Sequence, residues 1–244
     1  MKKIFLGVLL GLFLFVGIKG HAYGFGLVNK GNTRPSAGKY EAILKENGGV
    51  YLGPDTKDIY LTFDCGYENG HTKMILEALR KTGTKAIFFI TGHYLNSATD
   101  LVMEMIEGGH IIGNHTYSHK DFTKSSNEEI LNDIKKLENA FKEKTGSDMS
   151  KYVRPPRGEF DERSLKLLKD NGYASVFWSL AYVDWHQKVF HGDHYSYKQV
   201  MNRIHNGAIL LMHTVSKDNA VDLKDIIIQL KNDGYVFKTI ESVI

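Results

Sequence analysis

The sequence is poor in cysteine and proline. Cys65 is the single cysteine among 244 residues, which excludes an internal disulfide, and two of the four prolines are adjacent, at Pro155 and Pro156. Internal repeats and low-complexity tracts are also missing. Basic and acidic residues number 31 and 28, so no charge excess favours nucleic acid or an anionic membrane as a partner. Hydrophobic residues make up 42% of the chain, which is enough for a substantial core.

Residues 1–22 have the pattern of a secretory signal peptide. Lys2 and Lys3 precede an apolar run over residues 4–18, and small and polar residues follow. The run is short for a membrane span. We expect cleavage after Ala22, with an uncleaved anchor as the alternative, and in either case the rest of the chain would lie outside the cytoplasm. No cysteine flanks the segment, which excludes lipid attachment, and beyond it we expect no strong membrane binding.

From residue 58 onward, short apolar runs of β type alternate with helical patterns. The predicted strands are 59–63, 85–91, 110–113, 152–154, 174–180, 208–212 and 235–237. The predicted helices are 72–81, 98–107, 127–144, 162–170, 197–204 and 223–233. This alternation predicts a parallel sheet, and seven or eight such units predict an α/β barrel domain over residues 58–244. Residues 23–57, rich in glycine and asparagine, are predicted to form a short N-terminal arm.

Five chemically useful residues stand at or just after the ends of predicted strands. They are Asp64, His115, Arg154, Asp184 and His213. In α/β barrels the active site forms where the strands end, because the loops that follow the strands meet at that face. We therefore expect these five side chains to converge on one site.

His115 and His119 are the candidate metal ligands. Two histidines four residues apart would lie on one face of a helical turn, from which both imidazoles reach one ion. The alternative is a pair of surface or capping histidines. Cys65 is a candidate third ligand, since thiolate suits zinc. Neighbouring side chains of a strand point to opposite faces, however, so the alternative for Cys65, beside Asp64, is a small buried residue.

Asp64 is the candidate general base that activates a metal-bound water, with a helix cap as the alternative. Arg154 could keep Asp64 ionised by pairing with it. His213 ends an apolar run, so we expect a partly buried imidazole with a tunable pKa that acts as general acid for the leaving group; the alternative is a core histidine. Together these residues predict metal-assisted hydrolysis.

Four further residues are candidates for binding substrate. Arg157 projects from a turn stiffened by two prolines and could grip an anionic group through a forked contact, or else remain solvated. Asp184 and Trp185 could build a hydrogen-bonding and apolar wall of the pocket, or serve in core packing. Tyr117 could line the cleft.

The residues resemble the polysaccharide deacetylases, the NodB-homology family of carbohydrate esterase family four. The likeness extends over about residues 58–240 and is carried, in order, by residues 62–64, 115–119, 154–158, 184–185 and 210–213. It implies a distorted (β/α) barrel and metal-dependent removal of acetyl groups from N-acetylated sugars. It also implies Asp64 as base, His115 and His119 as metal ligands and His213 as acid, with the backbone N–H of Arg157 stabilising the oxyanion.

Three positions depart from the family pattern. Cys65 replaces an aspartate that binds the metal, Arg157 replaces an aromatic residue, and Ala181 replaces an aspartate. With these departures, residues 63–70, 154–158, 181–185, 213–216 and 218–220 resemble the muramic-δ-lactam deacetylases of spore-forming bacteria. That group removes acetyl from N-acetylmuramic acid whose peptide has been cleaved off, and the freed amine condenses with the lactyl carboxylate. Arg157 fits this substrate, because peptide-free muramic acid carries a carboxylate that N-acetylglucosamine lacks.

We therefore expect a monomeric enzyme that uses one divalent ion, zinc in the first place, and acts on a peptidoglycan glycan strand. Its place of action would be the cell wall or the forespore intermembrane space, and its product would lead to the muramic-δ-lactam of spore cortex. One alternative is a deacetylase of N-acetylglucosamine in peptidoglycan or chitin oligomers. The other is a relative that binds glycans without turning them over.

Overall fold

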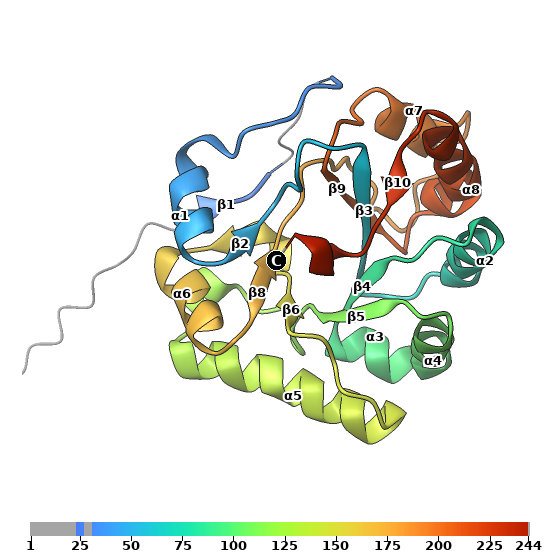
Figure 1. Ribbon diagram of the computed structural model, residues 1–244. Coiled ribbons are helices and arrows are strands. Elements are labelled where there is room, and N and C mark those ends of the chain that lie inside the picture. Colours follow the sequence, from blue (N-terminus) through green and yellow to red (C-terminus); the bar gives the residue numbers. More distant parts are fainter. Residues whose placement is uncertain (1–22, 27–30, 244) are drawn as a thin grey trace, which may run out of the picture.

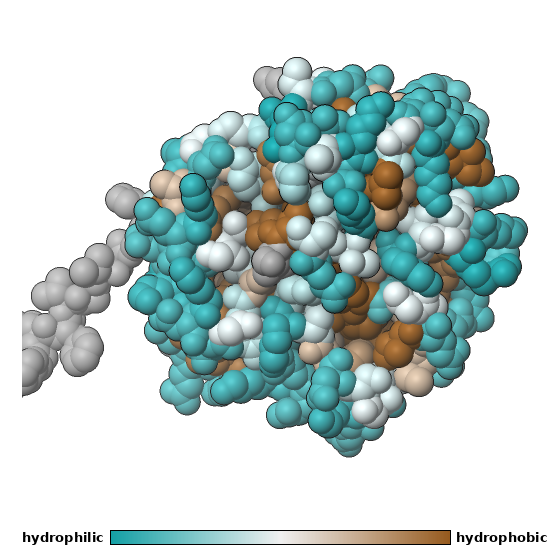
Figure 2. Space-filling model, viewed as in Figure 1, coloured by the Kyte–Doolittle hydropathy of each residue, from teal (hydrophilic) through white to brown (hydrophobic). Residues whose placement is uncertain are grey.

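A curled parallel sheet surrounded by helices forms the molecule (Figure 1). The computed structural model describes residues 23–26 and 31–243, so the predicted signal segment, residues 1–22, lies outside the described residues. None of the helices in the described ranges is long and apolar enough to cross a membrane. In the same view, Figure 2 shows a mostly hydrophilic surface with hydrophobic residues scattered across it.

The main sheet has the order β10-β3-β4-β5-β6-β8-β2, with β9 paired to β3, and its paired strands are parallel. Single bridges from Leu52 to Ala208 and from Leu180 to Leu210 bring the far end of this path back to β9, which gives a distorted barrel. The strands are β2 (Gly49–Val50), β3 (Asp58–Cys65), β4 (Ile87–Ile90), β5 (Ile111–Asn114), β6 (Tyr152–Val153), β8 (Ala174–Val176), β9 (Ala208–His213) and β10 (Val236–Phe237). The predicted fold class is confirmed.

Helices cover the outside of the sheet, and α5 is the longest of those described (Figure 1). Its start is fixed by a capping box, in which the side chains of Ser126 and Glu129 bond each other's backbone N–H groups. The α-helices are α1 (Glu41–Glu46), α2 (Thr72–Thr82), α3 (Gly92–Ser97), α4 (Thr99–Glu107), α5 (Asn127–Thr145), α6 (Glu162–Asp170), α7 (Tyr195–Met201) and α8 (Lys217–Asn232). The 3₁₀ turns are η1 (Gly38–Tyr40), η2 (Phe122–Lys124), η3 (Pro156–Gly158) and η4 (Ile240–Ser242).

Strand β3 separates two hydrophobic layers. Its alternate residues Ile59, Leu61, Phe63 and Cys65 belong to a cluster shared with α2 and α8, between the sheet and the helices. Tyr60, from the other face of the strand, belongs to a second cluster, which also contains Phe89, Phe177, Ile209 and Leu211. Because successive side chains alternate between faces, Asp64 is on the face of Tyr60, inside the barrel.

The segment predicted as an arm, residues 23–57, contributes strands as well as covering the barrel. Strand β2 is the last strand of the main sheet, and β1 (Tyr23–Gly24) pairs with β7 (Glu159–Phe160) in a separate antiparallel ribbon. Phe25, which follows β1, is buried among aromatic rings that include Phe177 and Trp178. Whether this segment is a unit distinct from residues 58–244 stays a prediction.

Candidate active site

A cavity of about 560 Å³ opens where the barrel strands end. Asp64 and His213 stand opposite each other at the ends of β3 and β9, and His115 directly follows β5. The cavity is lined by Phe25, Gly26, Asp64, Gly66, His115, His119, Arg157, Gly158, Trp178, Ala181, Trp185, Leu211 and His213. Of the five residues predicted at strand ends, Asp64, His115 and His213 therefore line one cavity.

Asp64 and Arg154 form a buried ion pair, as predicted. Arg154 Nη1 lies 2.7 Å from Asp64 Oδ1, and Arg154 is fully buried. Its Nε donates to the Val176 carbonyl, and its Nη2 donates to Thr62 Oγ1 and the Phe177 carbonyl, so the guanidinium is fixed in place. Burial, the largest single effect, would raise the pKa of Asp64. The charge and hydrogen bond of Arg154, together with the charges of His115 and His213, outweigh burial and hold that pKa below the usual value. Asp64 is therefore ionised at neutral pH.

His115 and His119 lie together, but the helical turn expected to join them is absent. The residues between them form a loop in which Thr116 and His119 have positive φ values of 64° and 54°. Side chains from elsewhere fix this loop: Thr116 N–H donates to Asn114 Oδ1, and Ser118 donates twice to a carboxylate of α5. The two imidazole centroids are nevertheless 4.8 Å apart, because the loop folds back on itself.

Both imidazoles are arranged as neutral bases. His115 Nδ1 lies 2.9 Å from the carbonyl oxygen of Arg154, which can only accept, so Nδ1 carries the proton and Nε2 keeps its lone pair. Nε2 is 3.5 Å from Asp64 Oδ2. Burial lowers the pKa of His115 and, together with His115, that of His119 to about 4. Two neutral nitrogens beside an ionised carboxylate suit a divalent ion.

The structure supports the alternative in which Cys65 is a small buried residue. It is fully buried in the cluster between the sheet and the helices, on the face of β3 opposite Asp64. Burial raises the pKa of its thiol well above the usual value, which disfavours a thiolate. Across the described ranges, no group of three or more His, Cys, Asp or Glu residues is placed to hold a metal. Cys65 is therefore not placed to bind an ion in this cavity.

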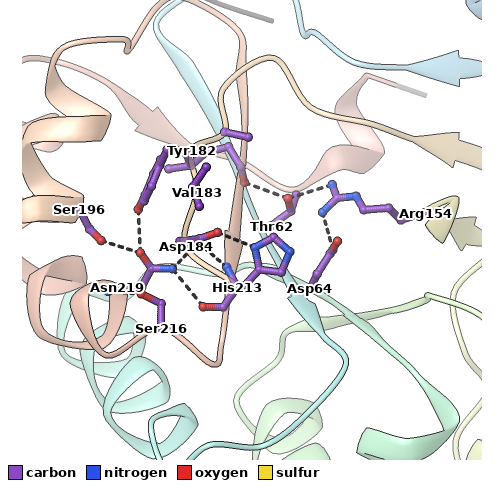
Figure 3. Close-up of polar contacts among 12 residues, drawn as sticks. Thr62, Asp64, Arg154, Tyr182, Val183, Asp184, Ser196, His213, Ser216 and Asn219 are labelled. Carbon is purple, nitrogen blue, oxygen red and sulfur yellow. Dashed lines mark hydrogen bonds and ion pairs between the residues drawn. The ribbon is translucent and has the colours of Figure 1, made fainter. Parts of the chain in front are cut away.

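His213 is held from behind by Asp184. The carboxylate accepts from His213 Nδ1 at 2.6 Å and from the His213 backbone N–H at 2.8 Å (Figure 3). Burial of His213 would lower its pKa, but the charge and hydrogen bond of Asp184 raise it above the usual value. Asp184 is itself buried and does not line the cavity, so the expectation of a direct substrate contact gives way to a role in positioning His213.

The remaining substrate candidates separate into two groups. Arg157 and Trp185 line the cavity, and both are about half exposed. The Trp185 ring packs edge-on to His213. Tyr117 does not line it. Its ring packs over Gly92 and under Lys136, because the loop that joins the two histidines turns it toward α3 and α5. The expectation for Tyr117 as a cleft residue was wrong.

Sequence reasoning missed the wall made by the N-terminal segment. Phe25 N–H donates to the Gly158 carbonyl, and Trp178 Nε1 donates to the Gly26 carbonyl. These bonds hold the η3 turn, in which Arg157 has a φ of 57°, against the cavity. A glycine at 158 is required, since a Cβ there would lie 2.8 Å from the Phe25 carbonyl oxygen. Pairing over more than 130 residues leaves no local signal.

A parallel barrel with an ionised carboxylate and a hydrogen-bonded imidazole at the strand ends belongs to the α/β-barrel hydrolases. Comparison with known proteins places the chain within that class. A family model described as polysaccharide deacetylase matches residues 52–176. An uncharacterised 30.6 kDa protein of Geobacillus stearothermophilus is 48% identical over 218 residues, 88% of this chain and 82% of that protein.

A second relative has a known name and a solved structure. The peptidoglycan-N-acetylmuramic acid deacetylase PdaA of Bacillus subtilis is 43% identical over 209 residues, 85% of this chain and 80% of PdaA. Its structure, described as a family 4 carbohydrate esterase, matches with a TM-score of 0.87 at 40% identity and covers 91% of this chain and 96% of that one. This chain belongs to the polysaccharide deacetylase family and is a hydrolase acting on amide bonds. The family resemblance is thus confirmed.

Proposed function

We propose that this enzyme removes the acetyl group from N-acetylmuramic acid in peptidoglycan strands whose peptides have been cleaved off. The name of its relative PdaA supports this sugar. In the chain itself, the observation that carries the proposal is Arg157 at the rim of the cavity that contains Asp64 and His213. It is the one lysine or arginine in the lining of this cavity as described. A guanidinium there selects a sugar that bears a carboxylate.

Arg157 has donors to spare for such a carboxylate. Its ion pairs with Glu159 at 2.8 Å and Asp121 at 3.3 Å both use Nη2, which leaves Nε and Nη1 for a substrate. Its side chain is 52% exposed, so a ligand can approach without displacing the core. The lactyl group of muramic acid becomes a free carboxylate once the peptide is removed. N-acetylglucosamine offers no such group to Arg157.

We further propose one divalent ion, zinc in the first place, held by His115 and His119. The donor chemistry fits: His115 Nε2 keeps its lone pair, His119 is neutral, and imidazole nitrogen suits zinc. With two protein ligands, more of the coordination sphere is open to water and substrate than in a site with three. When bound, the ion would polarise the acetyl carbonyl and make water more acidic.

The side chains of the chain then divide the proton transfers. Asp64, kept ionised by Arg154, accepts the proton of the attacking water through Oδ2, since Oδ1 is engaged by the guanidinium. The backbone N–H of Arg157 stabilises the oxyanion that develops on the acetyl carbon's oxygen. His213, protonated and held by Asp184 at Nδ1, delivers its Nε2 proton to the departing amine. Trp185 excludes water from one side.

The biological setting is also a proposal. We infer that the enzyme acts as a monomer, because one chain lines the whole described cavity. The pattern of residues 1–22 and the nature of the substrate support action outside the cytoplasm, in the cell wall or the forespore intermembrane space. The amine that the reaction frees lies beside the lactyl carboxylate, so its condensation product is the muramic-δ-lactam of spore cortex.

The test of this proposal compares two substrates in one variant. Arg157→Ala should lower kcat/KM on peptide-free muramyl glycan about tenfold or more, since a charge-assisted hydrogen bond contributes roughly 1.5–3 kcal/mol. Turnover of N-acetylglucosamine oligomers by the same variant should stay at the wild-type level. Arg80→Ala, on the exposed face of α2, is the control. An equal loss on both sugars would favour the N-acetylglucosamine alternative, and no acetate release by the metal-loaded wild type would favour the glycan-binding alternative.

A further inference from the structure

Asn219 connects both partners of the histidine–aspartate pair. It lies in the first turn of α8, is fully buried and does not line the cavity. Its Nδ2 donates to Asp184 Oδ2 at 2.6 Å and to the backbone carbonyl of His213 at 3.0 Å. Figure 3 shows this amide on the far side of Asp184 from the imidazole. The Asn219 side chain therefore binds both the Asp184 carboxylate and the end of β9, which carries His213.

The other end of the same amide is equally occupied. Asn219 Oδ1 accepts from the hydroxyls of Tyr182 at 2.7 Å and Ser196 at 2.7 Å. Carboxylate and carbonyl oxygens can only accept, whereas hydroxyls can donate, so the amide has a single orientation that satisfies all four bonds. A buried polar network in which every member is satisfied is rigid, and breaking one member leaves the others unpaired. The residues bonded by the Asn219 side chain come from the 182–184 segment, α7 and β9.

We infer that Asn219 is a positioning residue for this reaction, which fixes Asp184 and through it the imidazole of His213 with Nε2 turned to the substrate. The inference rests on the proposed function, since it assigns a role within the proposed proton transfer. Asp184 alone has freedom about its own side-chain bonds. The Asn219 bond to Oδ2 removes that freedom while Oδ1 holds Nδ1, so the proton donor is fixed before substrate arrives.

Asn219 brings no charge to the site. The charges that act on the pKa of His213 come from Asp184 and Asp64, which raise it, and from Arg154, which lowers it. The charge of His213 in turn lowers the pKa values of His115 and His119. Loss of the Asn219 amide therefore acts through the placement of Asp184: as the carboxylate moves away from Nδ1, the pKa of His213 falls.

The first experiment uses Asn219→Ala in the full-length protein. We expect kcat to fall by about tenfold to a hundredfold, because a displacement of a catalytic group by about 1 Å can reduce the rate by that much. KM should stay within about twofold, because the substrate pocket is untouched. The basic limb of the pH–kcat profile should move to lower pH. The backbone cap of α8 by Ser216 remains. Asn47→Ala, which removes a buried amide beside α1, is the control and should change neither kcat nor the profile.

The second experiment adds a milder variant and an NMR measurement that needs no substrate. Tyr182→Phe removes one hydroxyl from Asn219 Oδ1 and should lower kcat several-fold at constant KM. In ¹⁵N-histidine NMR, the Nδ1–H signal of His213 should be visible in the wild type, weaker in Tyr182→Phe and lost in Asn219→Ala. Unchanged kcat and an unchanged signal in both variants would overturn the inference. A wild type with the signal but without deacetylation would overturn the proposed function instead.

Discussion

The carboxylate of Asp64 and the thiol of Cys65 lie on opposite faces of β3, although the residues are neighbours in the chain. Asp64 faces the cavity and Arg154, whereas Cys65 packs among the residues between the sheet and the helices. The family's second aspartate has thus been replaced by a side chain of the core. We propose that His115 and His119, without Cys65, hold the metal in this site.

Metal content should therefore not depend on Cys65. Cys65→Ala removes one sulfur from a packed core and should cost about 1 kcal/mol of stability, with the metal content of the purified protein unchanged. His119→Ala should lose most of the metal. Elemental analysis of the two variants and the wild type makes the comparison. Metal lost on Cys65→Ala, in protein that remains folded, would make the thiol a ligand after all.

Breaking the Asp64–Arg154 pair should destabilise the protein strongly. Arg154→Met leaves a buried carboxylate without its partner, which costs roughly 3–5 kcal/mol in such cases. The pKa of Asp64 is lowered in the folded wild type, so the stabilisation is present at neutral pH and is lost as the pH falls through that pKa. The gap between variant and wild type in urea unfolding should narrow in acid.

Two further variants check that interpretation. Adding Asp64→Asn to Arg154→Met should recover part of the lost stability, because the uncompensated charge is gone. Arg80→Met breaks an exposed pair with Glu77 and should have little effect. If Arg154→Met were as mild as Arg80→Met at neutral pH, the ion pair would not be a structural element of the site.

The pH–rate profile should report the pKa of His213 on its basic side. As general acid His213 has to be protonated, and Asp184 raises its pKa, so activity extends to higher pH than an ordinary histidine allows. Asp184→Asn removes the charge but keeps the shape, which lowers the pKa of His213 and moves the basic limb to lower pH. A profile whose basic limb is the same in wild type and variant would contradict this role.

Phe25 should affect substrate binding rather than chemistry. Phe25→Ala removes a ring from the cavity wall and leaves the backbone hydrogen bond from Phe25 to Gly158 in place. Because Asp64 and His213 are untouched, we expect KM to rise several-fold with a smaller change in kcat. Tyr40→Phe, which keeps the neighbouring ring stack, is the control. Steady-state kinetics on the muramyl glycan make the test, and an unchanged KM would exclude the N-terminal segment from the binding site.

The sequence predicted what strand periodicity and strand ends determine. The alternation of faces in β3 separates Asp64 from Cys65, and parallel pairing brings His213 level with Asp64. The sequence did not predict features that depend on contacts between residues far apart in the chain. The loop of His115 and His119 depends on Asp133 of α5, the Phe25 wall depends on Trp178, and Asn219 reaches Asp184 across 35 residues. The position of Tyr117 between the two histidines did not indicate that its ring points away from the cavity.

The central claim is the choice of sugar. Purified protein supplied with zinc, and peptide-free muramyl glycan analysed by mass spectrometry, test it directly. The account predicts acetyl loss at muramic residues, with or without a further loss of water, while glucosamine residues stay acetylated. Deacetylated glucosamine beside intact muramic acid, or no acetyl loss from either sugar, would contradict it.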